Sequence, residues 1–336
     1  VMGQSNIAAG ATLGSNHNSR GADGEVIMGR GFWPGLCVSI KHNSVFASFA
    51  LLSKGDYNYE LNIPIPFSLI SNDPLKDELI IMPGYWFLYN FYALARNAWK
   101  YVDRDKRKYK TPIFEYDYLA PDSVNELFTA REIIAKAVAT AQLTKQKKTV
   151  FTDESKLLAL GENLLSTKTK KEIDALEITV NGFENSKRKV RLIKSYDAYH
   201  MFEKIIFIYG IEAALRVTEN KKGKNSISTL QQVKLSSTNL TWTNIGGQLI
   251  PNKNVEGLLN KIKSGAIESW NQVHAFYETE SEKYNTRKDL HALSTLEKLT
   301  KKSVNKVSTT QFVNWLDSYL EIKKDITARI HATRAK

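Results

Sequence analysis

The sequence predicts an α+β protein in which the terminal coils of a left-handed parallel β-helix precede an all-α helical domain. Residues 7–18 read IAAGAT and LGSNHN, two hexads that each begin with an aliphatic residue followed by a tiny one. A six-residue period of this kind is typical of stacked β-helical coils. Short apolar runs broken by glycines continue to about residue 84, and helical periodicity dominates the rest of the chain.

We divide the 336 residues into three parts. Residues 1–84 are expected to hold the β-helix coils with a loop and an extended arm, residues 85–120 an aromatic basic helix and a connector, and residues 121–336 the all-α domain. A hydrophobic fraction of 42% is that of an ordinary globular protein. Because a stacked fold needs at least about three repeats and a capped end, we expect the native N-terminus to be truncated here.

The strands are expected between residue 26 and residue 84. Residues 26–40 alternate apolar runs with glycines, as in strands broken by tight corners. Residues 57–69 carry Pro64 and Pro66, which exclude a central position in a sheet and predict an edge strand or an extended arm. Residues 79–82 are the last predicted strand.

The predicted helices share apolar residues at helical spacing. They cover residues 85–101, 121–143, 153–166, 169–178, 195–220, 252–264, 266–284, 286–303 and 308–331. Residues 187–191 read as a basic connection. Residues 242–251 interrupt the helices, because helices resist their glycine pair.

The net charge of +12 is distributed unevenly. Residues 1–95 carry −2, residues 96–150 carry +5, and the remainder carries +9. The lysines are scattered over the predicted helices beside glutamates rather than interleaved with aromatic residues. This pattern favours a solvated helical surface, and we do not expect nucleic acid as a partner.

The sequence also bears on compartment and cofactors. The single cysteine, Cys37, excludes an internal disulfide framework, and we interpret it as a small buried hydrophobe. There is no run of 18 apolar residues and no signal peptide pattern, so we expect a cytoplasmic protein without a membrane partner. No histidine has partners at metal-ligand spacing, and no motif identifies a cofactor.

Several short motifs resemble those of a known family. They are SNHNSR at 15–20, DGE at 23–25, MPGY at 82–85, RN at 96–97, RDKR at 104–107 and GGQLIP at 246–251, with further likeness at 264–265 and 270–274. With these motifs the chain resembles an uncharacterised bacterial family, a domain of unknown function. Its members carry a single-stranded left-handed β-helix of the hexapeptide-transferase superfamily, followed by a helical tail. The resemblance implies a longer N-terminus and carries no activity with it.

The superfamily also implies a role for His17. In hexapeptide transferases an imidazole that projects from a coil deprotonates a hydroxyl or an amine before it attacks a thioester. His17 occupies the fifth position of a hexad, where an inward-facing structural histidine is an equally good interpretation. The polar residues around it are candidates for substrate binding: Asn16, Asn18, Arg20, Asp23 and Glu25.

Three cations form a second candidate site. Arg96, Lys100 and Arg104 recur every four residues, which places them on one helix face. Since a partly buried cation needs a partner, they either pair internally or bind an external phosphate, and we favour the internal network. The candidate internal partners are Asp103, Asp105 and Asp117.

Two functions remain open at this stage. The first is a transferase acting on a nucleotide-linked or phosphorylated sugar, with His17 as the base and the three cations meeting phosphate. The alternative is a non-catalytic assembly or binding module whose β-helix offers a stacking or trimerising face. Open strand edges also predict a homo-oligomer.

Overall fold

The structure is a computed structural model that describes residues 5–15, 24–110, 112–219, 227–235 and 241–334. The chain divides into two compact units. The strand-bearing unit comprises residues 2–97 and 125–202, and the helical unit comprises residues 98–124 and 203–336.

Short strands dominate the first part of the strand-bearing unit. They are β1 (Thr12–Ser15), β2 (Ile27–Met28), β3 (Trp33–Pro34), β4 (Ser39–Lys41), β5 (Val45–Phe46), β6 (Leu51–Leu52), β7 (Asp56–Tyr57), β8 (Asn62–Ile63), β9 (Leu69–Asp73) and β10 (Glu78–Met82). Two further strands, β11 (Thr179–Val180) and β12 (Lys189–Leu192), come from much later in the chain.

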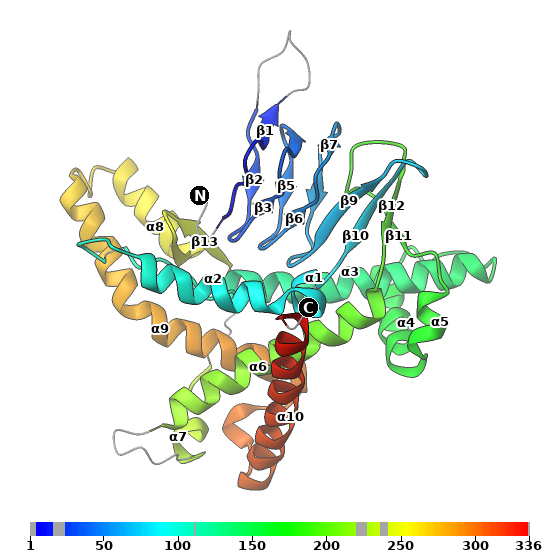
Figure 1. The fold of residues 1–336 in the computed structure, drawn as a ribbon. Helices are drawn as coiled ribbons and strands as arrows, with labels where there is room; N and C mark the ends of the chain where they lie inside the picture. The colour runs from blue at the N-terminus through cyan, green and yellow to red at the C-terminus, as the bar shows by residue number, and fades with distance from the viewer. Residues whose placement is uncertain (1–4, 16–23, 111, 220–226, 236–240, 335–336) are drawn as a thin grey trace. The chain divides into compact units, whose positions relative to one another are not determined.

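Parallel pairing joins strands that are three apart in the sequence (Figure 1). The orders β1-β4-β7 and β2-β5-β8 are separate three-stranded sheets. The third sheet runs β3-β6-β9 and continues through β10 and β12 to β11. It is mixed, because β10 is antiparallel to β9 and parallel to β12, with Leu79 opposite Val190.

The prediction of a left-handed β-helix with hexapeptide repeats is wrong. The strands form short, separate parallel and mixed sheets instead of one β-helix. The hexad pattern failed because its aliphatic positions do not share a core: Ile7 is 36% exposed and Leu13 is half-buried. Ile27, in the apolar run that follows the hexads, is 62% exposed. Ile40 and Leu52, which lie outside the two hexads, are fully buried.

Aromatic side chains fill the core of the strand-bearing unit. The rings of Phe49 and Phe67 stack with centroids 4.8 Å apart, and Phe67 lies 4.4 Å from Phe87 in helix α1 (Tyr85–Tyr89). The indole Nε1 of Trp86 donates a 2.7 Å hydrogen bond to the carbonyl oxygen of Phe49. Because a buried indole needs a partner for its N–H, this bond fixes α1 to the sheets.

The prediction of an all-α C-terminal part is also wrong, since β11 and β12 lie within it. Val190 and Leu192 are buried, while Lys189 is exposed and Arg191 is half-buried. This alternation has the period of two that a strand requires. The basic run at residues 187–191 therefore leads into a strand of the mixed sheet.

The remaining helices are α2 (Phe91–Arg104), α3 (Pro121–Lys145), α4 (Glu154–Thr167), α5 (Lys170–Asp174), α6 (Ser195–Thr218), α7 (Ile227–Gln231), α8 (Asn252–Lys263), α9 (Trp270–Thr300), the 3-10 turn η1 (Val304–Lys306) and α10 (Thr309–Arg334). The boundaries between the two units fall within α2, α3 and α6. Helix α9 is continuous where the sequence predicted two helices.

The segment with the glycine pair forms a hairpin in the helical unit. Strands β13 (Trp242–Ile245) and β14 (Gln248–Pro251) are antiparallel, and Gly246 and Gly247 connect them. Their φ angles of 61° and 102° lie in the left-handed region that favours glycine, which is the usual requirement of a two-residue hairpin turn. A Cβ on Gly247 would also lie 2.6 Å from the ring of Phe114.

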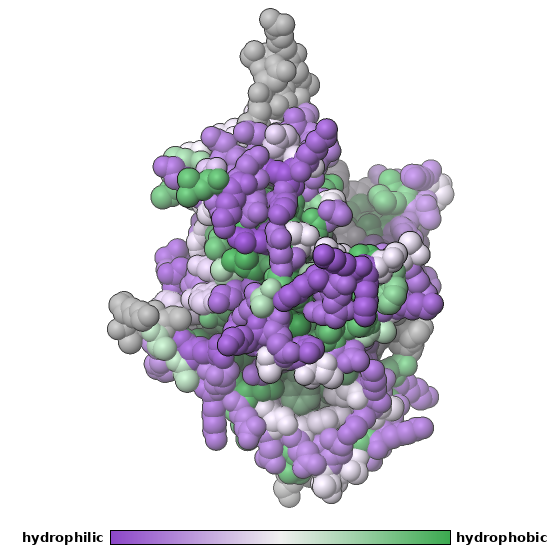
Figure 2. Space-filling view, turned by 90° about the vertical axis from the view of Figure 1, so that its right-hand side faces the viewer, coloured by the Kyte–Doolittle hydropathy of each residue, from purple (hydrophilic) through white to green (hydrophobic). Residues whose placement is uncertain are grey.

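The surface is largely polar. Hydrophilic side chains cover most of the face shown in Figure 2, with hydrophobic patches between them.

Cys37 is exposed and has a φ of 52°, so its interpretation as a buried hydrophobe is wrong. Within the described ranges, every helix is too short or too polar to traverse a bilayer.

Gly161 provides a test of the packing between α3 and α4. A Cβ on Gly161 would lie 1.9 Å from the carbonyl oxygen of Ala135, a backbone atom that has little room to move. We expect Gly161→Ala to lower the free energy of unfolding by about 1–3 kcal/mol through overpacking, measured by urea denaturation. The control is Gly257→Ala on α8, where nothing lies within 4 Å of the added Cβ. It should be neutral or raise stability by up to about 1 kcal/mol, and equal losses in both variants would contradict the tight α3–α4 contact.

Candidate functional site

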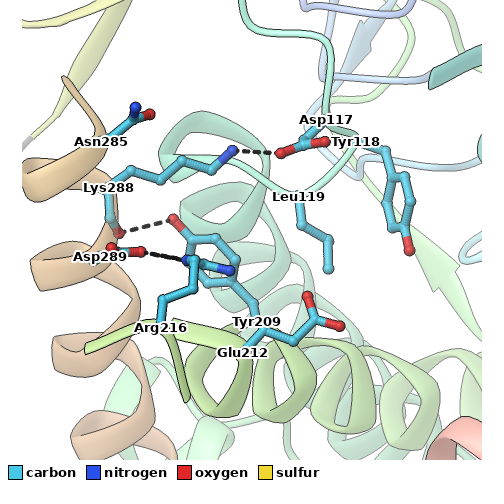
Figure 3. Close-up of a pocket in the computed structure, with 9 residues that line it drawn as sticks. All are labelled: Asp117, Tyr118, Leu119, Tyr209, Glu212, Arg216, Asn285, Lys288 and Asp289. Atoms are coloured by element: carbon cyan, nitrogen blue, oxygen red, sulfur yellow. Dashed lines mark hydrogen bonds and ion pairs between the residues drawn. The ribbon is translucent and has the colours of Figure 1, made fainter. Parts of the chain in front are cut away.

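The helical unit contains a polar pocket of about 450 Å³ (Figure 3). Three parts of the chain form it: the connector that precedes α3, the C-terminal half of α6, and α9. The lining residues are Asp117, Tyr118, Leu119, Tyr209, Glu212, Arg216, Asn285, Lys288 and Asp289. Three carboxylates and two cations therefore face one small volume.

One face of α6 supplies the floor of the pocket. Tyr209, Glu212 and Arg216 are spaced i, i+3 and i+7, so they lie on the same side of the helix. In Figure 3 the carboxylate of Glu212 points from α6 toward Leu119. Most apolar side chains of this helix are buried, which holds the polar face in place.

A buried ion network joins the connector to α9. The Nζ of Lys288 donates 2.8 Å hydrogen bonds to Glu115 and to Asp117, and the hydroxyl of Tyr284 also donates to Glu115. The side chain of Lys288 is 11% exposed and that of Glu115 only 4%. Burial acts to lower the pKa of Lys288, but the charges of Glu115 and Asp117 outweigh it, so the pKa is raised and Lys288 stays charged.

The second cation of the lining is paired as well. Arg216 donates through Nε and Nη2 to Oδ1 of Asp289, at 2.9 and 2.7 Å. Glu212 instead accepts from the hydroxyl of Tyr319 and from Nζ of Lys323, each at 3.2 Å, and both donors lie on α10. The cation that pairs with Glu212 therefore comes from α10 and is not one of the residues that line the pocket.

Burial, and after it the nearby carboxylates, raise the pKa of three tyrosines around the pocket. Burial is the largest cause that raises the pKa of Tyr319 to about 12, and the charge of Glu212 raises it further. The pKa of Tyr118 is raised first by burial and then by Glu212 and Asp117. The pKa of Tyr209 is likewise raised by burial, with Glu115 as the next cause. A negative charge on a tyrosine is thus disfavoured at three places around the pocket.

Behind Tyr209 lies a buried histidine. The hydroxyl of Tyr209 is 3.3 Å from Nδ1 of His291, whose ring is also 6.2 Å from that of Trp242. His291 is 2% exposed, and burial lowers its pKa to about 4, an effect that the charge of Asp122 opposes. His291 is therefore neutral at pH 7 and supports the pocket wall without adding a positive charge.

Most of the candidate residues predicted around His17 cannot be compared with this pocket. His17, Asn16, Asn18, Arg20 and Asp23 fall outside the described residues. Glu25 is exposed, and its backbone carbonyl accepts from the N–H of Asn43. Their proposed roles stay predictions.

The three cations of α2 are not paired with the predicted aspartates. Arg96 is half-buried, lies 3.5 Å from the side-chain oxygen of Asn97 and packs over the ring of Tyr92. Lys100 is half-buried and Arg104 is exposed. Asp105 instead pairs with Arg107 and Lys110, while Asp117 pairs with Lys288.

Sequence reasoning missed most of the pocket. Only Asp117 was named, and as a partner for the wrong cation. One signal was present: Glu212 and Arg216 interrupt the most apolar helix of the chain four residues apart, on the face that carries Tyr209. Charged residues on a buried helix need partners, so Glu212 and Arg216 indicated a polar face on this helix.

Comparison with known proteins identifies relatives without a described activity. Residues 223–332 match a family described as a domain of unknown function (DUF6819). Over its full length the chain is 36% identical to an uncharacterised protein from Treponema pallidum (strain Nichols). The chain spans 44% of that relative's length. No solved structure gives a significant match.

The family match covers one wall of the pocket. Asn285, Lys288 and Asp289 lie inside the matched residues, whereas Asp117 and Glu212 lie outside them. The hexapeptide-transferase part of the resemblance finds no support in these comparisons. Within the part of the chain that the structure describes, no three His, Cys, Asp or Glu side chains are grouped to hold a metal ion.

Proposed function

We propose that this chain is a non-catalytic binding module whose helical unit binds a small organic cation. The observation that carries the proposal is the excess carboxylate in the pocket. Among the lining residues, Lys288 pairs with Asp117 and Arg216 pairs with Asp289. The cation that pairs with Glu212 is Lys323, which lies outside the lining. A carboxylate in a partly enclosed, apolar-backed site favours an opposite charge beside it.

The remaining lining suits a flexible polar ligand. Leu119 and the rings of Tyr118 and Tyr209 offer apolar surface, and Asn285 offers both a donor and an acceptor. Pockets of a few hundred Å³ with a few convergent polar groups are the usual size for small-molecule sites. A diamine such as putrescine combines an apolar chain with two ammonium groups and matches this lining.

The transferase hypothesis is not retained. It depended on a likeness to hexapeptide transferases, whose β-helix this chain does not form, and on His17 as the base. The predicted homo-oligomer and the sugar phosphate partner stay predictions. Sedimentation at tens of micromolar, the range in which weak interfaces populate, tests the former.

Thermal unfolding with matched ligands tests the cation site. We expect putrescine to raise the melting temperature and butane-1,4-diol, of the same length but uncharged, to leave it unchanged. Glu212→Gln keeps the size of the side chain and should lower the affinity for putrescine about tenfold, the loss of one charge-assisted hydrogen bond.

The control variant is Glu321→Gln, an exposed glutamate on α10 outside the pocket lining. It should respond to putrescine as the wild type does. An equal loss in both glutamine variants would show a nonspecific charge effect, and an equal response to the diol would show that the ammonium groups are not recognised. Either result would contradict the proposal.

A further inference from the structure

A second pocket, of about 500 Å³, lies in the strand-bearing unit at the start of α6. Two segments line it: residues 174–178, between α5 and β11, and residues 191–195, where β12 leads into α6. Arg191 and Lys194 bring two cations to this end of the helix. The site is independent of the cation pocket, because every lining residue belongs to the other unit.

The N-terminal end of α6 offers backbone donors. The first hydrogen bond of the helix runs from the N–H of Ala198 to the carbonyl of Lys194. The N–H groups of residues 195–197 therefore precede the hydrogen-bonded ladder of this 24-residue helix. Lys194, with a φ of 57°, has no side-chain oxygen that accepts from them. Such an end carries a partial positive charge and attracts anions.

A buried hydroxyl adds an independent indication. Ser195 is 1% exposed and lines the pocket, and within the described residues its Oγ has no hydrogen-bond partner. The Nε of Arg191 also lacks a hydrogen bond there, although it lies 3.4 Å from Oε2 of Glu78. Buried polar groups without partners are rare in folded proteins, and the hydroxyl of Ser195 is such a group at this pocket.

The acidic side chains near this end are occupied by lysines. Asp174 pairs with Lys170 at 2.7 Å, and Glu177 pairs with Lys189 at 2.6 Å. Asp197, in the first turn of α6, is also paired with Lys170. Arg191 faces Glu78, and Lys194 offsets the second aspartate that shares Lys170. The side-chain charges around this end therefore balance, and the helix end supplies the partial positive charge that favours an anion.

We propose that the start of α6 binds a phosphate group through the N–H groups of residues 195–197, the hydroxyl of Ser195, and the cations of Arg191 and Lys194. Phosphate fits these donors because it has several acceptor oxygens and about two negative charges. The same chemistry is offered by free phosphate and by a small phosphate ester. A volume of about 500 Å³ leaves room for the organic part of an ester.

Isothermal titration of the whole chain with inorganic phosphate and with glucose 6-phosphate tests the site, with glucose as the uncharged comparison. We expect both phosphates to bind and glucose not to bind. Equal affinities identify free phosphate as the ligand, whereas tighter binding of the ester identifies the ester. Absence of binding by both at millimolar concentration would overturn the proposal.

Ser195→Ala is the decisive variant, because it removes a buried hydroxyl that has no hydrogen-bond partner among the described residues, and we expect the variant to fold. It should weaken phosphate binding about tenfold or more, as expected for a hydrogen bond to a charged group. Lys194→Gln should weaken binding and reduce its dependence on salt. Unchanged affinity in Ser195→Ala would contradict the site.

The matched control is Ser155→Ala near the start of α4, where Asp153 already accepts from the N–H groups of Ser155 and Lys156. It should bind phosphate as the wild type does. Glu212→Gln should also leave phosphate binding unchanged, so that this proposal and the cation site fail or succeed separately.

Discussion

Lys288→Met is expected to lower the free energy of unfolding by about 3–5 kcal/mol, measured by urea denaturation at pH 7. The substitution keeps most of the packing volume but removes the cation from Glu115, which is 4% exposed and would remain as a buried, unpaired charge. Loss of one partner of a buried ion pair is among the most destabilising single changes, because the other charge keeps its desolvation cost.

A double variant separates the pair from the packing. Glu115→Gln in the Lys288→Met background removes the orphan charge and should recover a large part of the lost stability. The matched single control is Lys283→Met, an exposed lysine on the same helix, which should change stability by less than about 0.5 kcal/mol. If Lys288→Met were no worse than Lys283→Met, the network between the connector and α9 would not exist in solution.

His291 is expected to make the protein lose stability as the pH falls from about 6.5 to about 4. In the unfolded chain this imidazole binds a proton near pH 6.5, whereas in the folded protein burial lowers its pKa to about 4. Above pH 6.5 both states are neutral, so stability is full. Between the two values only the unfolded state is protonated, so stability falls with decreasing pH and levels off below about 4.

The size of this effect follows from the pKa difference. At 1.36 kcal/mol per unit, the loss approaches about 3 kcal/mol. Tyr209 and Trp242 lie beside His291, and the charge of Asp122 opposes the shift of its pKa. His291→Gln should remove this part of the pH dependence, whereas His274→Gln, at an exposed position of α9, should keep it. Parallel pH profiles for wild type and His291→Gln would contradict the buried neutral histidine.

Long-period patterns gave the reliable part of the sequence prediction. The α+β class is confirmed, and the helix expected at residues 121–143 is α3, Pro121–Lys145. Its apolar positions repeat over seven turns, so chance matches are suppressed. The glycine pair at Gly246 and Gly247 correctly predicted a break between helices. The preference of glycine for positive φ depends on the residue itself, so it can be read from the sequence.

The strands were harder to predict because half of those in the described residues contain only two residues. Two hexads cannot establish a repeat, and the exposed Ile7 shows that an aliphatic residue at the right spacing need not face a core. Strand β12 was interpreted as part of a basic connection because of its lysine and arginine residues. The buried Val190 and Leu192 alternate with these charges, as a strand requires. Pairing of β10 with β12 joins residues more than a hundred positions apart, which no local pattern encodes.

The candidate site could be predicted only in part. Glu212 and Arg216 on an apolar helix indicated a polar face, but their neighbours Asp117 and Asp289 come from distant segments. Cations at regular spacing drew attention to α2 instead, where Arg96 has no carboxylate partner in the described contacts. The spacing of residues along one helix shows which of them share a face, but it does not show which other segments pack against that face.

Isothermal titration of the wild-type chain with putrescine at low salt tests the central claim most directly, because it measures binding of a cation to a pocket with an excess carboxylate. The account predicts saturable binding of one putrescine per chain, weakened about tenfold in Glu212→Gln and screened as salt increases. Absence of binding at millimolar putrescine, or equal affinity in Glu212→Gln, would contradict it.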